Sequence, residues 1–196
     1  MYCNSILNML TLTLNNDASI VKFVNIFRHL RNVVSDANIV ITSDRLYIQG
    51  MDSSHVCLVE VSLKNTWFNS LIITDDELLL GVNCETLFTI LNFWKTGYNI
   101  EFSMDSTDVL KIQYKGDSMV TRSYEMPLMD IYNEPMDIPE KEPDVSIIID
   151  SSEFKNMMQE LSTFGDELII RNNNDTDDPD NVYLVFQSSG EIGKAT

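Results

Sequence analysis

One stretch of the chain limits its folding more than any other: the acidic, proline-rich residues 127–144, PLMDIYNEPMDIPEKEPD. They hold four of the five prolines and show neither the helical nor the strand period of apolar residues. Proline fixes φ and removes a backbone donor, so we expect an extended, exposed connector between two folded parts. Large apolar residues recur within it: Leu128, Met129, Ile131, Met136 and Ile138. An ordinary linker would not carry them, so we expect the connector to lie against a surface.

The residues before the connector predict strands and two helices. Residues 6–14 predict a strand, and a first helix is expected within residues 17–36, capped by Asp17 or Ser19. Its apolar residues form one stripe: Ile20, Phe23, Phe27, Leu30 and Val34. A second helix is expected over residues 83–97, capped by Asn83 and stopped at Gly97. Further strands are expected at 38–43, 45–51, 55–63, 67–73, 77–82, 99–104, 109–115 and 120–126.

After the connector the first pattern returns. VSIIID (145–150) predicts a strand, residues 151–165 a capped helix with Phe154, Met157, Met158 and Leu161, and residues 166–172 and 182–190 two strands. We interpret the recurrence as an internal repeat of a strand-helix-strand unit. The second copy has no counterpart of the second helix. We therefore expect either a fragment or a sheet completed by something else, with boundaries at 1–127, 128–142 (connector) and 143–196.

Charge and cysteine content limit the function classes. A net charge of −17 argues by default against nucleic-acid or membrane partners, but the charge is uneven. Residues 18–35 contain Lys22, Arg28 and Arg31 without an acid, so we expect one locally positive surface. No apolar run approaches the roughly 18–20 residues of a membrane span. Three widely spaced cysteines without a CxxC pair predict reduced thiols, not a disulfide framework or a zinc site.

Catalytic motifs are missing from the sequence. It contains no GxGxxG, Walker loop, GxSxG or HExxH pattern. We therefore expect no enzyme, no cofactor and no metal site.

Several segments closely resemble the eukaryotic-type DNA sliding clamp family, proliferating cell nuclear antigen. They are MDSSHVCLVEVSL (51–63), LLLGVN (78–83), YEMPLMDI (124–131), IPEKE (138–142), SSEFKNMMQELSTFGDELII (151–170) and SSGEIG (188–193), in the order and spacing of that family. The resemblance implies an α+β DNA clamp fold with repeated strand-helix-strand units. Antiparallel sheets would lie outside and helices would line a central channel. Family subunits are longer, so we expect this chain to be C-terminally incomplete.

The resemblance also implies a pocket for short partner peptides, bordered by the MDSSHV loop and the connector. Carried over by position, its residues are Met51, His55, Val56, Leu58, Met136, Ile138 and Pro139. Met and Ile suit a site that accepts many partners, because such side chains repack around different anchors. Without the resemblance we would interpret Met51 and Val56 as core and Met136 as a loosely packed linker residue.

Channel residues implied by the resemblance are Lys22, Arg28, Arg31, Lys95 and Lys155. Several usually basic positions are neutral here, which weakens the expected attraction to DNA, and an ordinary solvated position is an equal alternative for each residue. The expected function is a polymerase processivity factor that encircles duplex DNA and tethers polymerase, clamp loader and repair proteins. We expect a homotrimer in the nucleus or at a viral replication site. The alternative is a clamp-derived interaction platform that no longer encloses DNA.

Overall fold

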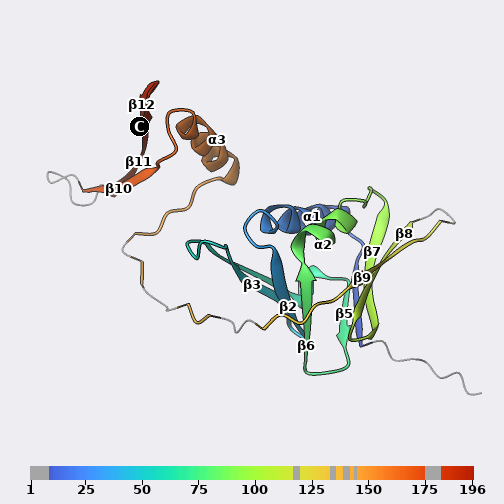
Figure 1. Ribbon diagram of the computed structural model, residues 1–196. Coiled ribbons are helices and arrows are strands. Elements are labelled where there is room, and N and C mark those ends of the chain that lie inside the picture. Colours follow the sequence, from blue (N-terminus) through green and yellow to red (C-terminus); the bar gives the residue numbers. More distant parts are fainter. Residues whose placement is uncertain (1–8, 117–119, 133–135, 139–141, 144, 175–181) are drawn as a thin grey trace, which may run out of the picture. The chain divides into compact units, whose positions relative to one another are not determined.

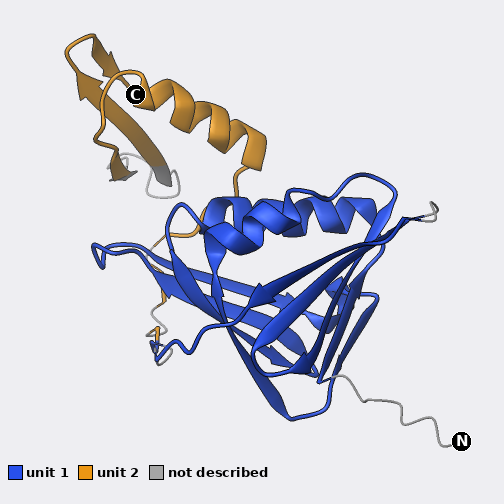
Figure 2. Cartoon of the chain, turned by 45° about the vertical axis from the view of Figure 1, so that its right-hand side comes forward, with its two compact units in different colours: residues 1–137 blue, residues 138–196 orange. Residues whose placement is uncertain are grey.

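The computed structural model describes residues 9–116, 120–132, 136–138, 142–143, 145–174 and 182–196 (Figure 1). The chain forms two compact units, residues 1–137 and 138–196, shown in different colours in Figure 2. Each unit is described by itself below. No helix in the described part of the chain combines the length and apolar character needed to cross a membrane.

Unit 1 contains two antiparallel sheets and two α-helices. The first sheet has the order β5-β1-β7-β8-β9, with β1 Leu10–Leu14, β5 Ser70–Ile73, β7 Tyr98–Ser106, β8 Val109–Gly116 and β9 Arg122–Pro127. The second has the order β4-β3-β2-β6, with β2 Asp36–Thr42, β3 Arg45–Met51, β4 Leu58–Lys64 and β6 Glu77–Asn83. The helices are α1 Asp17–Leu30, α2 Cys84–Leu91 and the short 3-10 helix η1 Asn65–Trp67. Figure 1 shows α1 and α2 together over the same side of the sheets.

The core of unit 1 lies between the sheets and the helices. Alternate residues of the strands point into it, such as Leu10, Leu12 and Leu14 of β1. Four residues of the predicted stripe lie in α1 and are buried, as a 3.6-residue period requires of a helix packed on one side: Ile20, Phe23, Phe27 and Leu30. The fifth, Val34, is buried too, but it follows the end of the helix at Leu30. Tyr114 is also buried, and its hydroxyl donates to the Ile90 carbonyl at 2.7 Å. That bond satisfies the one polar atom that the ring carries into the core, and burial raises the pKa of Tyr114.

The helix ends differ in part from prediction. Asn16, not Asp17 or Ser19, caps α1, because its side-chain oxygen accepts from the Ser19 N–H at 3.1 Å. Asn83 caps α2 as predicted and accepts from the Thr86 N–H at 2.9 Å.

The predicted stop of α2 at Gly97 is wrong, because the helix already ends at Leu91. The Trp94 indole N–H donates a hydrogen bond to the Tyr98 carbonyl at 2.5 Å. A loop closed by this bond follows the helix in place of further helical turns. Gly97 has φ +86°, the left-handed conformation that favours glycine, and leads this loop into β7.

The observed first residues of two strands also differ from the predicted ones. The strand predicted from His55 begins at Leu58 as β4, and the strand predicted from Trp67 begins at Ser70 as β5. In the second case η1 takes up the preceding residues. The predicted strand 45–51 has the observed bounds of β3.

Unit 2 contains α3 Ser151–Ser162 and an antiparallel sheet of order β10-β11-β12, with β10 Ile169–Asn174, β11 Val182–Gly190 and β12 Gly193–Ala195. The predicted strand VSIIID is wrong: residues 145–150 form no strand. A strand needs a neighbouring strand to pair with its backbone N–H and C=O groups, and no described strand pairs with residues 145–150. Its last residue, Asp150, caps α3 and accepts from the Ser152 and Glu153 N–H groups. The predicted α+β class with antiparallel sheets is confirmed.

Candidate functional site

The loop between β3 and β4 is built around one carboxylate. Asp52 accepts from the backbone N–H groups of Ser54 at 3.2 Å, Val56 at 2.8 Å and Cys57 at 2.6 Å, and also from the Ser54 hydroxyl. The Ser54 hydroxyl, followed by the Cys57 N–H, holds the pKa of Asp52 well below its usual range. The acid therefore stays ionised and keeps the loop in one shape.

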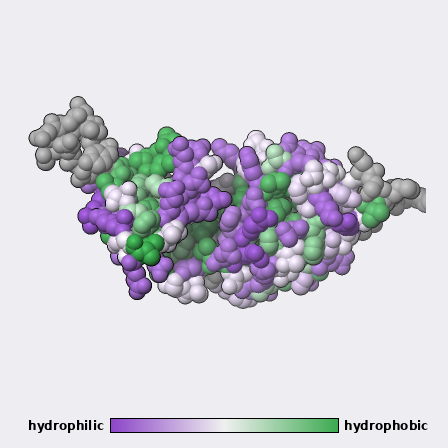
Figure 3. Space-filling model, turned by 90° about the horizontal axis from the view of Figure 1, so that it is seen from above, coloured by the Kyte–Doolittle hydropathy of each residue, from purple (hydrophilic) through white to green (hydrophobic). Residues whose placement is uncertain are grey.

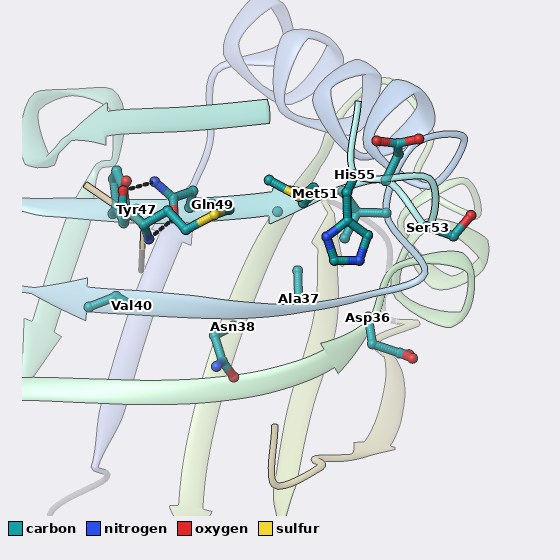
Figure 4. Close-up of a pocket in the computed structure, with 13 residues that line it drawn as sticks. Asp36, Ala37, Asn38, Val40, Tyr47, Gln49, Met51, Ser53 and His55 are labelled. Carbon is teal, nitrogen blue, oxygen red and sulfur yellow. Dashed lines mark hydrogen bonds between the residues drawn. The ribbon is translucent and has the colours of Figure 1, made fainter. Parts of the chain in front are cut away.

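His55 stands at the tip of this 52–57 loop in an unusual conformation. Its φ is +58°, and its N–H donates to the Asp52 carbonyl at 3.0 Å. A positive φ is uncommon outside glycine and is found mainly where the surroundings require it. Figure 4 shows the His55 imidazole extending from the loop toward the β2 side, beside Met51.

The connector enters the site along β6. The Met129 N–H donates to the Gly81 carbonyl at 2.9 Å, and the two residues form an isolated antiparallel bridge. A Cβ added to Gly81 would stand 1.9 Å from the Met129 carbonyl oxygen. Only glycine therefore allows the connector to approach β6 so closely.

Two side-chain amides hold the connector further along. The Asn38 Nδ2 donates to the Ile131 carbonyl at 3.0 Å. The Gln49 carboxamide makes two hydrogen bonds with the backbone of Met136 (dashed in Figure 4). Gln49 Nε2 donates to the Met136 carbonyl at 2.9 Å, and the Met136 N–H donates to Gln49 Oε1 at 2.6 Å. The connector thus lies against a surface, as predicted.

These contacts follow one row of the sheet. Asn38 of β2 pairs with Gly81 of β6 on one side and with Gln49 of β3 on the other. The contacts with the connector therefore lie on three successive strands at the same level. We call Gly81, Asn38 and Gln49 the connector row.

A hollow of about 410 Å³ opens between the 52–57 loop and the connector; we call it the connector pocket. It is lined by Val34, Asp36, Ala37, Asn38, Val40, Tyr47, Gln49, Gly50, Met51, Asp52, Ser53, His55 and Met136. A second hollow of about 580 Å³ is lined on another side by residues 129–132 and shares four lining residues with the first: Val34, Asp36, Met51 and Ser53. The lining of the connector pocket combines apolar side chains with about as many polar ones, and a concave site of this kind can hold a short peptide or a small ligand.

Three of the seven predicted pocket residues come together in the connector pocket: Met51, His55 and Met136. Val56 is 86% exposed, and neither it nor Leu58 is among the lining residues of either hollow.

The other two predicted residues cannot be compared in the same way. Ile138 belongs to unit 2, where it is 49% exposed. Pro139 lies outside the described residues. The grouping of all seven residues stays a prediction.

The structure contradicts the core interpretation of this region. Met51 is only partly buried and Val56 is exposed, so neither is a core residue. The backbone of Met136 is held by two hydrogen bonds to Gln49, while the residue is 43% exposed.

Sequence reasoning missed Asp52 and the connector row. The outward positions of Asn38 and Gln49 were readable, because each alternates with buried residues of its strand. What they bind was not readable, since their partners lie 93 and 87 residues away in the chain.

The five predicted DNA-facing residues differ in how free they are. Lys22 and Arg28 are exposed on α1, Lys95 is exposed in the turn after α2, and Lys155 is exposed on α3 of unit 2. Arg31 is engaged within unit 1: its Nη1 donates to both Glu85 carboxylate oxygens at 2.8 Å. Its guanidinium also lies 4.1 Å from the centre of the Phe88 ring. Whether any of these residues meets DNA stays a prediction.

Seen from above, the surface is mainly hydrophilic with separate hydrophobic patches (Figure 3). Among the described residues no cluster of three or more His, Cys, Asp or Glu side chains is arranged to hold a metal ion.

Comparison with known proteins finds similarity to DNA sliding clamps. The family model of the proliferating cell nuclear antigen N-terminal domain matches residues 9–135. A "probable DNA polymerase sliding clamp 2" of Paramecium bursaria Chlorella virus 1 is 28% identical over 196 residues. That alignment covers 98% of this chain and 67% of the viral protein.

Proposed function

Because the chain belongs to the proliferating cell nuclear antigen family of DNA sliding clamps, we propose that it tethers replication proteins to DNA through the connector pocket. Members of this family are non-enzymatic processivity factors, as the absence of catalytic motifs predicted. Family membership also implies partnership with DNA and polymerase and assembly into a multimer. The finer proposal concerns which surface of this chain binds those partners.

One observation carries the proposal: the connector is hydrogen-bonded onto the sheet beside the 52–57 loop, and a hollow with both apolar and polar lining residues remains between them. Met51 and Met136 stand on its walls, and flexible thioether side chains adapt to different apolar anchors. The occupant that fits is a short peptide with a glutamine, an aliphatic anchor and paired aromatic residues. Polymerase, clamp loader and repair proteins would present such peptides.

On the DNA side we propose encirclement of duplex DNA by a ring of three subunits. Support comes from the family and from the exposed cations Lys22 and Arg28 on α1, which lie on a chain of net charge −17. Few phosphate contacts give weak attraction with a shallow salt dependence, and a ring needs no more because it is held by topology. We propose the nucleus or a viral replication site as its location.

A peptide titration tests the pocket. A fluorescent peptide of the stated composition should bind this chain, and Met136→Asp should weaken binding at least about tenfold by placing a charge against an apolar anchor. Ile72→Asp is the matched control, because Ile72 is 60% exposed on β5 in the other sheet. Equal loss in both variants, or no binding by the unchanged chain, would refute the pocket.

Encirclement is tested with nicked circular DNA. A ring should stay on circular DNA in high salt and leave once the DNA is linearised. Loss from both forms at the same rate would instead identify an interaction platform that does not enclose DNA. Light scattering on the same sample gives the number of subunits.

A further inference from the structure

We propose that the connector row positions the connector for partner binding, and that Gln49 controls peptide affinity by holding Met136 in place. The inference rests on the proposed function, because it concerns the same pocket. It adds a positioning role for residues of the sheet beneath the connector.

The geometry at Gln49 imitates a strand. In an antiparallel pair, two facing residues exchange two N–H to O=C bonds. Here the Gln49 carboxamide takes the place of the second strand: it donates to the Met136 carbonyl at 2.9 Å and accepts from the Met136 N–H at 2.6 Å. Both polar groups of one connector residue are therefore satisfied by one side chain. This fixes the position and the rotation of the backbone at Met136, and with them the direction in which its side chain enters the pocket.

Asn38 restricts the connector at a second point. Its Nδ2 donates to the Ile131 carbonyl at 3.0 Å, while its Oδ1 is buried without a hydrogen-bond partner among the described residues. A buried unpaired acceptor is costly. Turning the amide over would set this oxygen against the Ile131 carbonyl oxygen, so the connector contact determines which way the amide points.

Gly81 restricts it at a third point, through space. The Met129 carbonyl oxygen occupies the volume that a Cβ at position 81 would need, at 1.9 Å. The close approach then allows the 2.9 Å bond from the Met129 N–H to the Gly81 carbonyl. The three points are consecutive in the sheet because Asn38 pairs with both Gly81 and Gln49.

The consequence is an equilibrium between a docked and a released connector. A peptide needs the docked form, because Met136 lines the pocket only there. The observed affinity is then the intrinsic affinity reduced by the docked fraction. A change in the connector row lowers affinity through that fraction, without removing any contact with the peptide.

The first experiment replaces Gln49 by Met, which keeps the length of the side chain and removes both hydrogen bonds. Losing about two neutral hydrogen bonds should shift the docking equilibrium about tenfold, so we expect the affinity for the fluorescent peptide to fall by up to about tenfold. Gln49→Glu should also lose affinity, because a carboxylate cannot donate to the Met136 carbonyl. Gln113→Met is the matched control: Gln113 is partly exposed on β8 and alternates with the buried Ile112 and Tyr114.

A second readout separates positioning from general destabilisation. In Gln49→Met, hydrogen exchange at the Met136 amide should rise as the peptide affinity falls, because both report the released connector. Exchange in β1 and β7 and the unfolding temperature should stay as in the unchanged chain. In a separate variant, Gly81→Ala, the Met129 amide should lose its protection from hydrogen exchange. This variant should also bind the peptide more weakly than the unchanged chain.

Each outcome decides the matter. If Gln49→Met binds the peptide like the unchanged chain, or keeps its Met136 amide protected, the positioning role is refuted while the pocket stands. If the unchanged chain does not bind the peptide, the proposed pocket fails first and the inference fails with it. If affinity falls without faster exchange at Met136, Gln49 touches the peptide itself and the inference is wrong.

Discussion

The two units contain the same local pattern, an apolar strand-like segment followed by an amphipathic helix, but they bury it differently. In unit 1 α1 buries its whole apolar stripe against two sheets, and α2 packs beside it. In unit 2 Leu161 is the one described hydrophobic residue of α3 that is fully buried, and Phe154 is 41% exposed. An amphipathic pattern states which face a helix can bury. A core forms only where a second layer meets that face.

The strand-like segments show the same contrast. β1 pairs with β5 on one side and with β7 on the other, so its backbone is satisfied along both edges. Residues 145–150 pair with no described strand, and Ile148 is fully exposed. A run of apolar residues is therefore not sufficient to form a strand. A strand also needs neighbouring strands that pair with its backbone.

The largest expected effect compares one helix phenylalanine of each unit, buried in unit 1 and partly exposed in unit 2. Phe27→Ala in α1 should lower the free energy of unfolding by about 3–5 kcal/mol, because Phe27 is almost completely buried. Phe154→Ala in α3 should cost about 1 kcal/mol or less, since Phe154 mainly contacts Phe186 edge to face.

Urea unfolding followed by tryptophan fluorescence measures this difference for unit 1 alone. Both tryptophans of the chain, Trp67 and Trp94, lie in unit 1. Phe27→Ala should shift the fluorescence transition and Phe154→Ala should leave it in place. A shift of similar size in both variants would show that the units share their stability.

The next effect compares helix caps. Asn83→Ala should cost unit 1 about 1 kcal/mol, because the Thr86 N–H loses its acceptor. Asp150→Ala removes two such bonds in unit 2 and should reduce helical circular dichroism without moving the tryptophan transition. An unchanged helix signal in Asp150→Ala would mean that α3 is held by more than its cap.

A pH titration compares two acids, Asp52 of unit 1 and Asp150 of unit 2. Hydrogen bonds lower the pKa of both in the folded protein: chiefly the Ser54 hydroxyl for Asp52 and the Ser152 N–H for Asp150. A folded pKa below the unfolded value means that the stabilisation is present above the unfolded value of about 3.9 and is lost as pH falls through the folded pKa.

NMR shifts of the Val56 and Cys57 amides should therefore stay constant from neutral pH down through the ordinary carboxyl pKa of about 3.9. In Asp52→Asn, which cannot ionise, the same amides should differ from the unchanged chain at every pH. A midpoint near the ordinary carboxyl range in the unchanged chain would contradict the proposed role of Asp52 in the loop.

The smallest effect concerns the ion pair between Arg31 and Glu85, which joins the two helices of unit 1. Among the described residues, α3 has no such ion pair. Glu85→Gln should cost about 0.5 kcal/mol, as usual for an exposed ion pair. It also frees the charge of Arg31, so binding of duplex DNA at low salt should rise by up to about threefold. Thr89→Val, on the exposed side of α2, is a control that leaves the pair intact. Unchanged DNA binding in Glu85→Gln would argue against a channel role for Arg31.

What the sequence predicted depended on distance along the chain. The α1 stripe and the Asn83 cap follow from residues within a few positions of one another, and both were predicted. The cap at Asn16 was missed by one residue, because several residues there are suitable acceptors. Residues 145–150 were predicted wrongly, since a strand depends on partners that local pattern does not contain.

The candidate site divides in the same way. Resemblance to the family placed Met51, His55 and Met136 together, and the structure brings these three side chains to one hollow. The row beneath the connector could not be found, because a polar residue on the outer face of a sheet looks the same whether it meets water or a segment about ninety residues away.

The close contact at Gly81 also has a consequence for how such a chain can diverge. Every other amino acid brings a Cβ into the space of the Met129 carbonyl. Substitutions in the connector can alter the side chains offered to partners while its backbone keeps its course. A substitution at position 81 displaces that course itself, so a lineage could accept one only together with compensating changes in the connector. Partner preference can thus drift in small steps, whereas the path of the connector changes only by a coordinated jump.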